Sequence, residues 1–224
     1  MAQVVGGLVS YIERAAKLPP RTLTVAEQKK LLAVSGQHRD GLRDHCIFSV
    51  TLSGGLRESE IVGLNVGDVV AVDKEGSCRW PLKVKRTIEL RIYKRLPSTD
   101  GNAQYIRLSD AAFFKLQKYV DAVFVDHGYK PEATSPLFRS RKGGRRMSTK
   151  AVRTLFHTWQ RRAGFSKLHG FHVLRHTAIS NAYRDSKSIR LAQRIARHAD
   201  IRTTTRYEHA SDEDVEKVAR NMIS

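Results

Sequence analysis

A single region of this sequence alternates apolar and polar side chains with the period of two that marks a half-buried strand. Residues 87–94 read TIELRIYK, in which Ile88, Leu90 and Ile92 are the apolar positions. Residues 104–109, QYIRLS, repeat the pattern, and the intervening LPSTDGNA is rich in turn formers. These segments predict one antiparallel hairpin, so the β-structure of the chain is expected to be small.

The other segments have helical patterns, separated by residues that end helices. Thr24, with Glu27 three residues later, has the pattern of a capping box and predicts a helix start. Gly54 and Gly55 separate two further helices, of which the second is predicted over about 57–64. Later helices are predicted over 110–126, 148–163, 172–184, 188–196 and about 211–222. The predicted fold class is α+β and mainly α-helical, with one small antiparallel sheet.

Pro19 and Pro20 mark the start of the predicted domain, because consecutive prolines end a helix. Residues 1–22 are expected to be a linker or the remnant of a missing N-terminal domain. Residues 23–224 are expected to form one compact domain that ends in a tail helix at about 211–222.

Composition places the protein inside the cell. Cys46 and Cys78 are the only cysteines, which favours a reducing compartment with two free thiols or one pair. The N-terminus lacks the pattern of a signal peptide, and no run approaches the ~18 apolar residues of a membrane-spanning helix. We therefore expect a soluble, cytoplasmic protein with no membrane partner.

The net charge is strongly positive. The chain has 40 Lys and Arg against 22 Asp and Glu, which gives +18 at pH 7, and residues 133–184 contain no acidic residue. Such an excess favours a polyanionic partner, nucleic acid before an anionic membrane, over charge that serves only solubility. Within this segment the loop SRKGGRR holds the candidate DNA-binding residues Arg141, Lys142, Arg145 and Arg146.

The segment FHVLRHTAIS crowds His172, Arg175 and His176 into little more than one helical turn. His172 and Arg175 are three residues apart and therefore share one face of the predicted helix. Crowding groups that can carry positive charge is unfavourable unless an anion belongs among them. Arg57, in GGLRESE, follows two glycines at a helix start, where free N–H groups and the helix dipole also favour an anion.

Four segments together resemble the tyrosine recombinases, the phage integrase family. GGLRESEIVGL is similar to the first arginine box of that family, and FHVLRHTAIS to the second. RHADIRTTTRYEH is similar to the terminal segment, in which Tyr207 follows His198 by nine residues. LPPRTLTVAEQKKLL is similar to the start of these catalytic domains, so the resemblance covers roughly residues 20–224. It implies the integrase catalytic fold and site-specific DNA recombination through a 3′-phosphotyrosyl intermediate.

The resemblance also implies roles for individual residues. Tyr207 is the expected nucleophile, and Arg57 and Arg175 are expected to clamp the scissile phosphate. His198 is expected to donate a hydrogen bond to the phosphate, and His172 to act as an acid–base group. The residue chemistry agrees, because a phenol can form a covalent phosphoester and two guanidinium groups can hold a phosphate in bidentate fashion.

A hairpin lysine is expected to protonate the leaving 5′-oxygen. Lys94 is preferred, because it continues the inward parity of the strand, whereas Lys83 and Lys85 precede the regular alternation. Glu60 lies three residues after Arg57, and either orients that side chain or forms an ordinary surface pair with it.

Two further positions lie beside this set. His176 is expected to pack next to the site or to support it from behind. Arg197 stands where the family usually has glycine, which implies either a changed local geometry or an added phosphate contact. No carboxylate cluster suited to Mg²⁺ occurs near these residues, so no metal or cofactor is expected.

The expected partners are double-stranded DNA and further copies of this chain, as a homo-tetramer on paired DNA sites, in the cytoplasm with the nucleoid. Family members normally carry an N-terminal helical DNA-binding domain, whereas only about 20 residues precede the matching region here. The chain is therefore either truncated or a minimal recombinase. Two other functions remain open: a type IB topoisomerase, or a catalytically silent basic protein that binds DNA or RNA.

Overall fold

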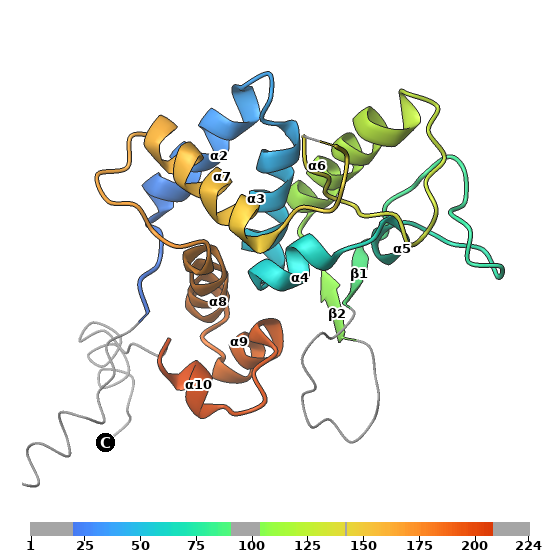
Figure 1. The fold of residues 1–224 in the computed structure, drawn as a ribbon. Coiled ribbons are helices and arrows are strands. Elements are labelled where there is room, and N and C mark those ends of the chain that lie inside the picture. The colour runs from blue at the N-terminus through green and yellow to red at the C-terminus, as the bar shows by residue number, and fades with distance from the viewer. Residues whose placement is uncertain (1–19, 91–103, 142, 208–224) are drawn as a thin grey trace, which may run out of the picture.

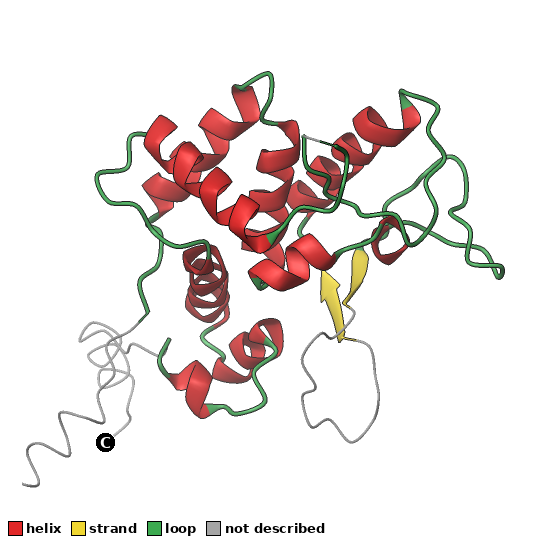
Figure 2. Cartoon of the chain, in the orientation of Figure 1, coloured by secondary structure: helices red, strands yellow, loops and turns green. Residues whose placement is uncertain are grey.

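A computed structural model describes residues 20–90, 104–141 and 143–207 (Figure 1). In chain order its elements are α2 (Val25–Gln37), α3 (Leu42–Gly54), α4 (Glu58–Gly63), α5 (Val66–Val69), β1 (Thr87–Leu90), β2 (Gln104–Arg107), α6 (Asp110–Val120), the π-helical turn η1 (Asp121–Val125), α7 (Thr149–Arg162), α8 (His172–Ser186), α9 (Ile189–Ala196) and α10 (Arg202–Thr205). The fold is mainly helical with a small antiparallel sheet, as the sequence predicts (Figure 2). The predicted tail helix at about 211–222 lies outside the described residues.

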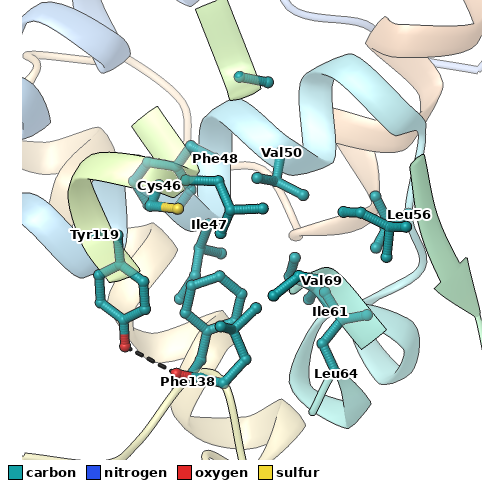
Figure 3. Close-up of a cluster of buried hydrophobic side chains, with 14 of the residues drawn as sticks. Cys46, Ile47, Phe48, Val50, Leu56, Ile61, Leu64, Val69, Tyr119 and Phe138 are labelled. Atoms are coloured by element: carbon teal, nitrogen blue, oxygen red, sulfur yellow. Dashed lines mark hydrogen bonds between the residues drawn. The ribbon is translucent and has the colours of Figure 1, made fainter. Parts of the chain in front are cut away.

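Helix α3 forms the centre of the hydrophobic core. Cys46, Ile47, Phe48 and Val50 are fully buried on it, and α2, α6 and α8 pack around it. Figure 3 shows part of this core, in which Ile61 of α4 and Tyr119 of α6 lie among the side chains of α3. The Tyr119 hydroxyl on α6 donates to the carbonyl of Leu137 at 3.0 Å, which satisfies a polar group inside an apolar region.

The hairpin forms as predicted. β1 and β2 pair antiparallel with Ile88 opposite Ile106. Ile88 and Leu90 are buried while Glu89 is exposed, so the period of two separates the core face from the solvent face. Residues 91–103, where the rest of the first strand and the turn are predicted, lie outside the described part of the chain, and Lys94 lies among them.

The predicted helix boundaries are also confirmed where they are described. Thr24 and Glu27 form the capping box of α2, with the Thr24 N–H donating to Glu27 at 2.7 Å and the Glu27 N–H donating to Thr24 Oγ1 at 3.2 Å. α3 ends at Gly55, which has φ of +58°, a conformation that glycine adopts without the steric cost of a Cβ. The division at residue 22 stays a prediction.

Helices α8, α9 and α10 lie together below the layer of α2, α3 and α7 in the view of Figure 1. α8 packs on both α3 and α9. A second small cluster, formed by Ile179, Ala192, Ala196 and Tyr207, holds the segment after α10 against α8 and α9. The N–H of Leu23 donates to Thr177 Oγ1 on α8 at 2.8 Å, so the start of the described chain also fixes α8 in place.

Both cysteines, buried Cys46 and half-buried Cys78, are free thiols. Among the described helices, none has the length and apolar character needed to cross a membrane.

Candidate active site

Arg175 lies at the centre of the site. Its side chain projects from α8, where the residue is 2% exposed. Its Nη1 donates to the carbonyl of Gly55 at 2.6 Å, and its Nη2 donates to the carbonyl of Ala196. One guanidinium therefore joins the end of α3 to the end of α9. Burial, with the nearby charges of Arg57 and Arg197, lowers the pKa of Arg175 to about 9, so the group stays protonated at neutral pH.

Arg57 occupies the N-cap position of α4, with Glu60 at the third helical position. The Arg57 N–H donates to Glu60 Oε2 at 2.7 Å, and Arg57 Nη1 donates to Oε1 at 2.6 Å. The Glu60 side chain is only 13% exposed. Of the two readings for Glu60, the geometry favours an orienting role, because a buried carboxylate that binds both backbone and side chain fixes the direction of Arg57.

Glu60 also pairs with Arg197, whose Nη2 lies 2.7 Å from Glu60 Oε2. Burial favours the neutral acid, but the charge of Arg197 and the bonds from Arg57 outweigh it, and the pKa of Glu60 falls below its usual value. Glu60 is therefore an ionised carboxylate between two arginines.

Arg197 follows α9 in the left-handed conformation, with φ of 52°. This is the region that glycine adopts freely, which explains why glycine suits the position. The guanidinium is 6% exposed and turns inward. It donates to the carbonyls of Gly54 at 2.9 Å and Gly55 at 3.1 Å, besides the ion pair with Glu60. These contacts join the turn before Arg57 to the end of α9.

His198 is the next residue, held by hydrogen bonds on both its backbone and its ring. The carbonyl of His198 accepts from Gln193 Nε2 at 3.1 Å, and its Nδ1 lies 3.0 Å from Oγ1 of buried Thr204. Burial, followed by the charges of Arg175 and Arg57, lowers the pKa of His198 to about 4, so the ring is neutral near pH 7. In the tautomer in which Nδ1 accepts from the Thr204 hydroxyl, the ring proton is on Nε2, where it can be donated to an anion.

Tyr207 follows the single turn of α10 and is 5% exposed. Its ring is stacked beside His198, with centroids 6.4 Å apart, and its hydroxyl lies 2.5 Å from Nδ1 of His176. Burial raises the pKa of Tyr207, although the charges of Arg175 and Arg206 act in the opposite direction. The phenol therefore keeps its proton at neutral pH unless a base removes it.

His172 completes the cluster from the first turn of α8. The residue is exposed, and its ring meets the His176 ring edge-on at 5.2 Å between centroids. Although the residue as a whole is exposed, partial burial of its ring and the charge of Arg175 lower the pKa of His172, while the charge of Glu58 acts in the opposite direction. The structure thus brings together residues from three segments distant in sequence: Arg57, Glu60, His172, Arg175, His198 and Tyr207.

The candidate DNA-binding loop is less uniform than its sequence indicates. Arg146 donates to the carbonyls of Val62 at 2.9 Å and Leu64 at 3.1 Å, so its guanidinium supports the chain around α4. Arg141 donates to the carbonyl of Asp40, and the three described arginines of the loop, Arg141, Arg145 and Arg146, are all exposed. Lys142, like Lys94, lies outside the described residues.

Two residues of the site have contacts that sequence reasoning missed. His176 was expected to pack beside the site or to support it from behind, and the sequence did not indicate its bond to the Tyr207 hydroxyl. Arg197 was expected to change the local geometry or to add a phosphate contact, and nothing in the sequence indicates its pairing with Glu60. Among the described residues, no group of three or more His, Cys, Asp or Glu side chains is arranged to hold a metal ion.

Comparisons with known proteins extend over most of the chain. Residues 21–214 match the model of the phage integrase family. The tyrosine recombinase XerC of Proteus mirabilis is 26% identical over 199 residues, covering 89% of this chain and 58% of the relative. The chain thus spans less than two thirds of the length of such relatives.

Two solved structures have a similar fold. The Tn1549 transposon integrase, in complex with circular intermediate DNA, superimposes with a TM-score of 0.66 at 20% identity, covering 91% of this chain and 66% of that one. The catalytic domain of bacteriophage HP1 integrase gives a TM-score of 0.57 at 21% identity, covering 92% of this chain and 95% of that one. At these identities the likeness concerns the fold.

Proposed function

Because this chain belongs to the phage integrase family, we propose that it is a site-specific DNA recombinase, an enzyme that cleaves and rejoins DNA strands through a 3′-phosphotyrosyl intermediate. One observation carries the proposal: the hydroxyl of Tyr207 contacts His176 and lies close enough to Arg175 for the two charges to interact. A phenol in that setting can attack a phosphorus atom whose charge the cluster stabilises.

The scissile phosphate would bind between Arg57 and Arg175. The Arg57 side chain is 35% exposed, against 6% for Arg197. Arg57 can therefore donate N–H groups to a ligand, whereas Arg197 donates to groups of the protein. The Nε2–H of His198 would supply a further donor. These groups are fixed before the substrate arrives, so little reorganisation is needed as charge grows on the non-bridging oxygens.

In the cleavage step the Tyr207 oxygen forms a bond to phosphorus, and the bond from phosphorus to the 5′-oxygen breaks. The leaving 5′-oxygen takes a proton, for which we propose Lys94 as donor, and His172 assists as an acid–base group. The phosphodiester bond energy is kept in the phosphotyrosine. A 5′-hydroxyl from another strand can then attack that bond and restore continuous DNA without a cofactor.

Double-stranded DNA is the proposed partner. The charge of +18 suits a polyanion, and the Tn1549 integrase of similar fold was solved with DNA. The relatives reported above are a recombinase and integrases, which favours strand exchange over relaxation of supercoils by a type IB topoisomerase. The intact set of Tyr207, Arg57 and Arg175 argues against a silent binding protein.

We further propose a homo-tetramer on paired sites, in the cytoplasm at the nucleoid. Each chain brings one nucleophilic tyrosine, Tyr207, and exchanging four strands between two duplexes requires four nucleophiles. The mass of the complex on paired sites, measured in solution, tests the tetramer.

The covalent intermediate can be tested with a nicked suicide substrate, which traps the enzyme on DNA because the cut fragment diffuses away. Wild-type protein should give a protein–DNA band that resists denaturation. Tyr207→Phe should bind the same DNA with unchanged affinity and give no band, because only the phenol oxygen is lost. Tyr183→Phe, which changes a half-buried tyrosine on α8, is the matched control and should retain the band. A band from Tyr207→Phe as strong as that of wild type would contradict the assignment.

A further inference from the structure

The nucleophile already has a hydrogen-bond partner in the free protein. The Tyr207 hydroxyl and Nδ1 of His176 are 2.5 Å apart, and the two ring centroids are 5.8 Å apart at an angle of 39°. Among the hydrogen bonds of the described residues, none joins His172 to that hydroxyl, although the resemblance gives His172 the acid–base role.

We propose that His176 is a catalytic residue that accepts the proton of Tyr207 as the phenol attacks phosphorus. The inference rests on the proposed function and assigns one proton within it. The O–H bond of Tyr207 breaks, its proton passes to Nδ1 of His176, and the phenol oxygen bonds to phosphorus. The bond to the 5′-oxygen breaks in the same step, and that oxygen receives its proton from the separate general acid. On rejoining, the imidazolium returns its proton to the departing phenol oxygen.

His176 is held where this transfer requires it. It lies in the first half of α8, between Arg175 and Thr177. Arg175 binds the carbonyls of Gly55 and Ala196. Thr177 donates to the carbonyl of Val173 at 2.8 Å and accepts from the Leu23 N–H. The imidazole therefore projects from a helix that is anchored on both sides of it, and Tyr207 is held against the same helix by the Ile179 cluster.

The charge state of His176 suits a proton acceptor. The groups that face its ring are His172 and Arg175 on α8, and Arg206 and Tyr207 after α10, with His198 beyond. Burial, then the charges of His172, Arg175 and Arg206, lowers the pKa of His176 to about 4, so the ring is neutral at neutral pH. The proposed step uses the tautomer in which the ring proton is on Nε2 and Nδ1 accepts. A bound phosphate would bring negative charge next to these cations. Its charge would raise the pKa of His176 and so favour proton transfer from the phenol.

The test is single-turnover cleavage of the suicide substrate. His176→Ala should bind DNA like wild type and cleave it more slowly by roughly a hundredfold or more, the usual size of general base catalysis. Imidazole added to the buffer should restore much of the rate, because it can enter the space that the side chain leaves. The wild-type rate should become independent of pH once His176 is neutral, whereas the His176→Ala rate should keep rising towards the high pKa of the phenol.

A second variant separates proton transfer from positioning. His176→Asn places an amide near the position of Nδ1, which can hold the phenol by a hydrogen bond but cannot take its proton. It should therefore remain slow and keep the altered pH profile. The same amide also preserves much of the side-chain volume, so it answers the question even if the alanine variant folds poorly.

His172→Ala is the matched control on the same helix, one turn earlier. If His176→Asn cleaves at the wild-type rate, or if imidazole rescues His172→Ala and not His176→Ala, His176 does not accept the proton. Failure of the two proposals would look different. Wild-type protein that forms no covalent band would contradict the proposed function and this step with it. A normal wild-type band with unimpaired His176 variants would contradict only the role of His176.

Discussion

The number of arginines paired with Glu60 determines how strongly Arg57 can attract a phosphate. If Glu60 paired with Arg57 alone, the two charges would cancel and Arg57 would attract a phosphate weakly. Arg197 supplies a second cation to the same carboxylate, with its Nη2 2.7 Å from Oε2. The group of three therefore carries a net positive charge. The left-handed backbone of Arg197 costs about 1–2 kcal/mol relative to a right-handed one, which these buried contacts offset.

Replacing Arg197 with glycine separates these effects. Arg197→Gly removes the backbone strain but also the bonds to Gly54, Gly55 and Glu60. We expect cleavage to slow by about tenfold or more, since one hydrogen bond to a charged group is worth roughly 1.5–3 kcal/mol. The measurement is the rate of covalent band formation at saturating DNA. Arg194→Gln, which removes an exposed charge from the same helix, should be nearly neutral. A wild-type rate for Arg197→Gly would show that Glu60 needs no second cation.

At the scale of the elements, the site is assembled from helix ends. The start of α4 carries Arg57, the start of α8 carries His172, and the residues after α9 and α10 carry His198 and Tyr207. Helix ends have backbone groups without intrahelical partners, and Arg175 satisfies two such carbonyls, those of Gly55 and Ala196. The shortness of α10, only four residues, returns the chain to α8 and places the Tyr207 hydroxyl on it.

The hairpin should supply the general acid through the parity of β1. Ile88 and Leu90 face the core, and Lys94 continues their parity beyond the described strand. Lys94→Ala should slow cleavage by roughly a hundredfold, and a substrate with sulfur as the 5′-bridging atom should restore the rate, since a thiolate leaves without a proton. Lys85→Ala is the control, because Lys85 Nζ lies 3.3 Å from the carbonyl of Gly67 and serves the fold there. If the sulfur substrate restores the rate of Lys85→Ala and not that of Lys94→Ala, the general acid is Lys85.

Across the whole molecule, positive charge has two separate uses. Part of it is structural, as in Arg146, whose guanidinium binds the carbonyls of Val62 and Leu64. The acid-free segment 133–184 supplies much of the remaining positive charge, for which we propose a role in binding DNA. A count of basic residues therefore overstates the number of phosphate contacts, because an arginine that donates to protein carbonyls has fewer N–H groups left for phosphate.

Salt dependence can measure the contacts that remain. Affinity for DNA should fall steeply with salt, with a slope of about 0.9 log unit for each phosphate neutralised. Arg145→Gln, in the exposed part of the loop, should flatten that slope without altering sequence preference. Arg146→Gln should instead lower the free energy of unfolding, because the carbonyls of Val62 and Leu64 lose their donor. Equal slopes for wild type and Arg145→Gln would mean that this loop does not touch phosphate.

The sequence by itself predicted the longer described helices, the pairing of the two strands and the candidate site residues, but not the short helices α5 and α10. The alternation around Ile88, the capping box at Thr24 and the break at Gly55 are local signals, set by side chains within a few positions of one another. The identity and order of Arg57, Arg175, His198 and Tyr207 were likewise readable as motifs.

Only the tertiary structure decided what these residues touch. Glu60 and Arg197 are 137 positions apart, and His176 and Tyr207 are 31 apart. Whether such groups meet depends on how α4, α8, α9 and α10 pack, which no short pattern encodes. The packing of these helices therefore places Arg197 beside Glu60 and His176 beside Tyr207. Burial against neighbouring helices fixes the distances between these groups and their charge states, and the proposed chemistry depends on both.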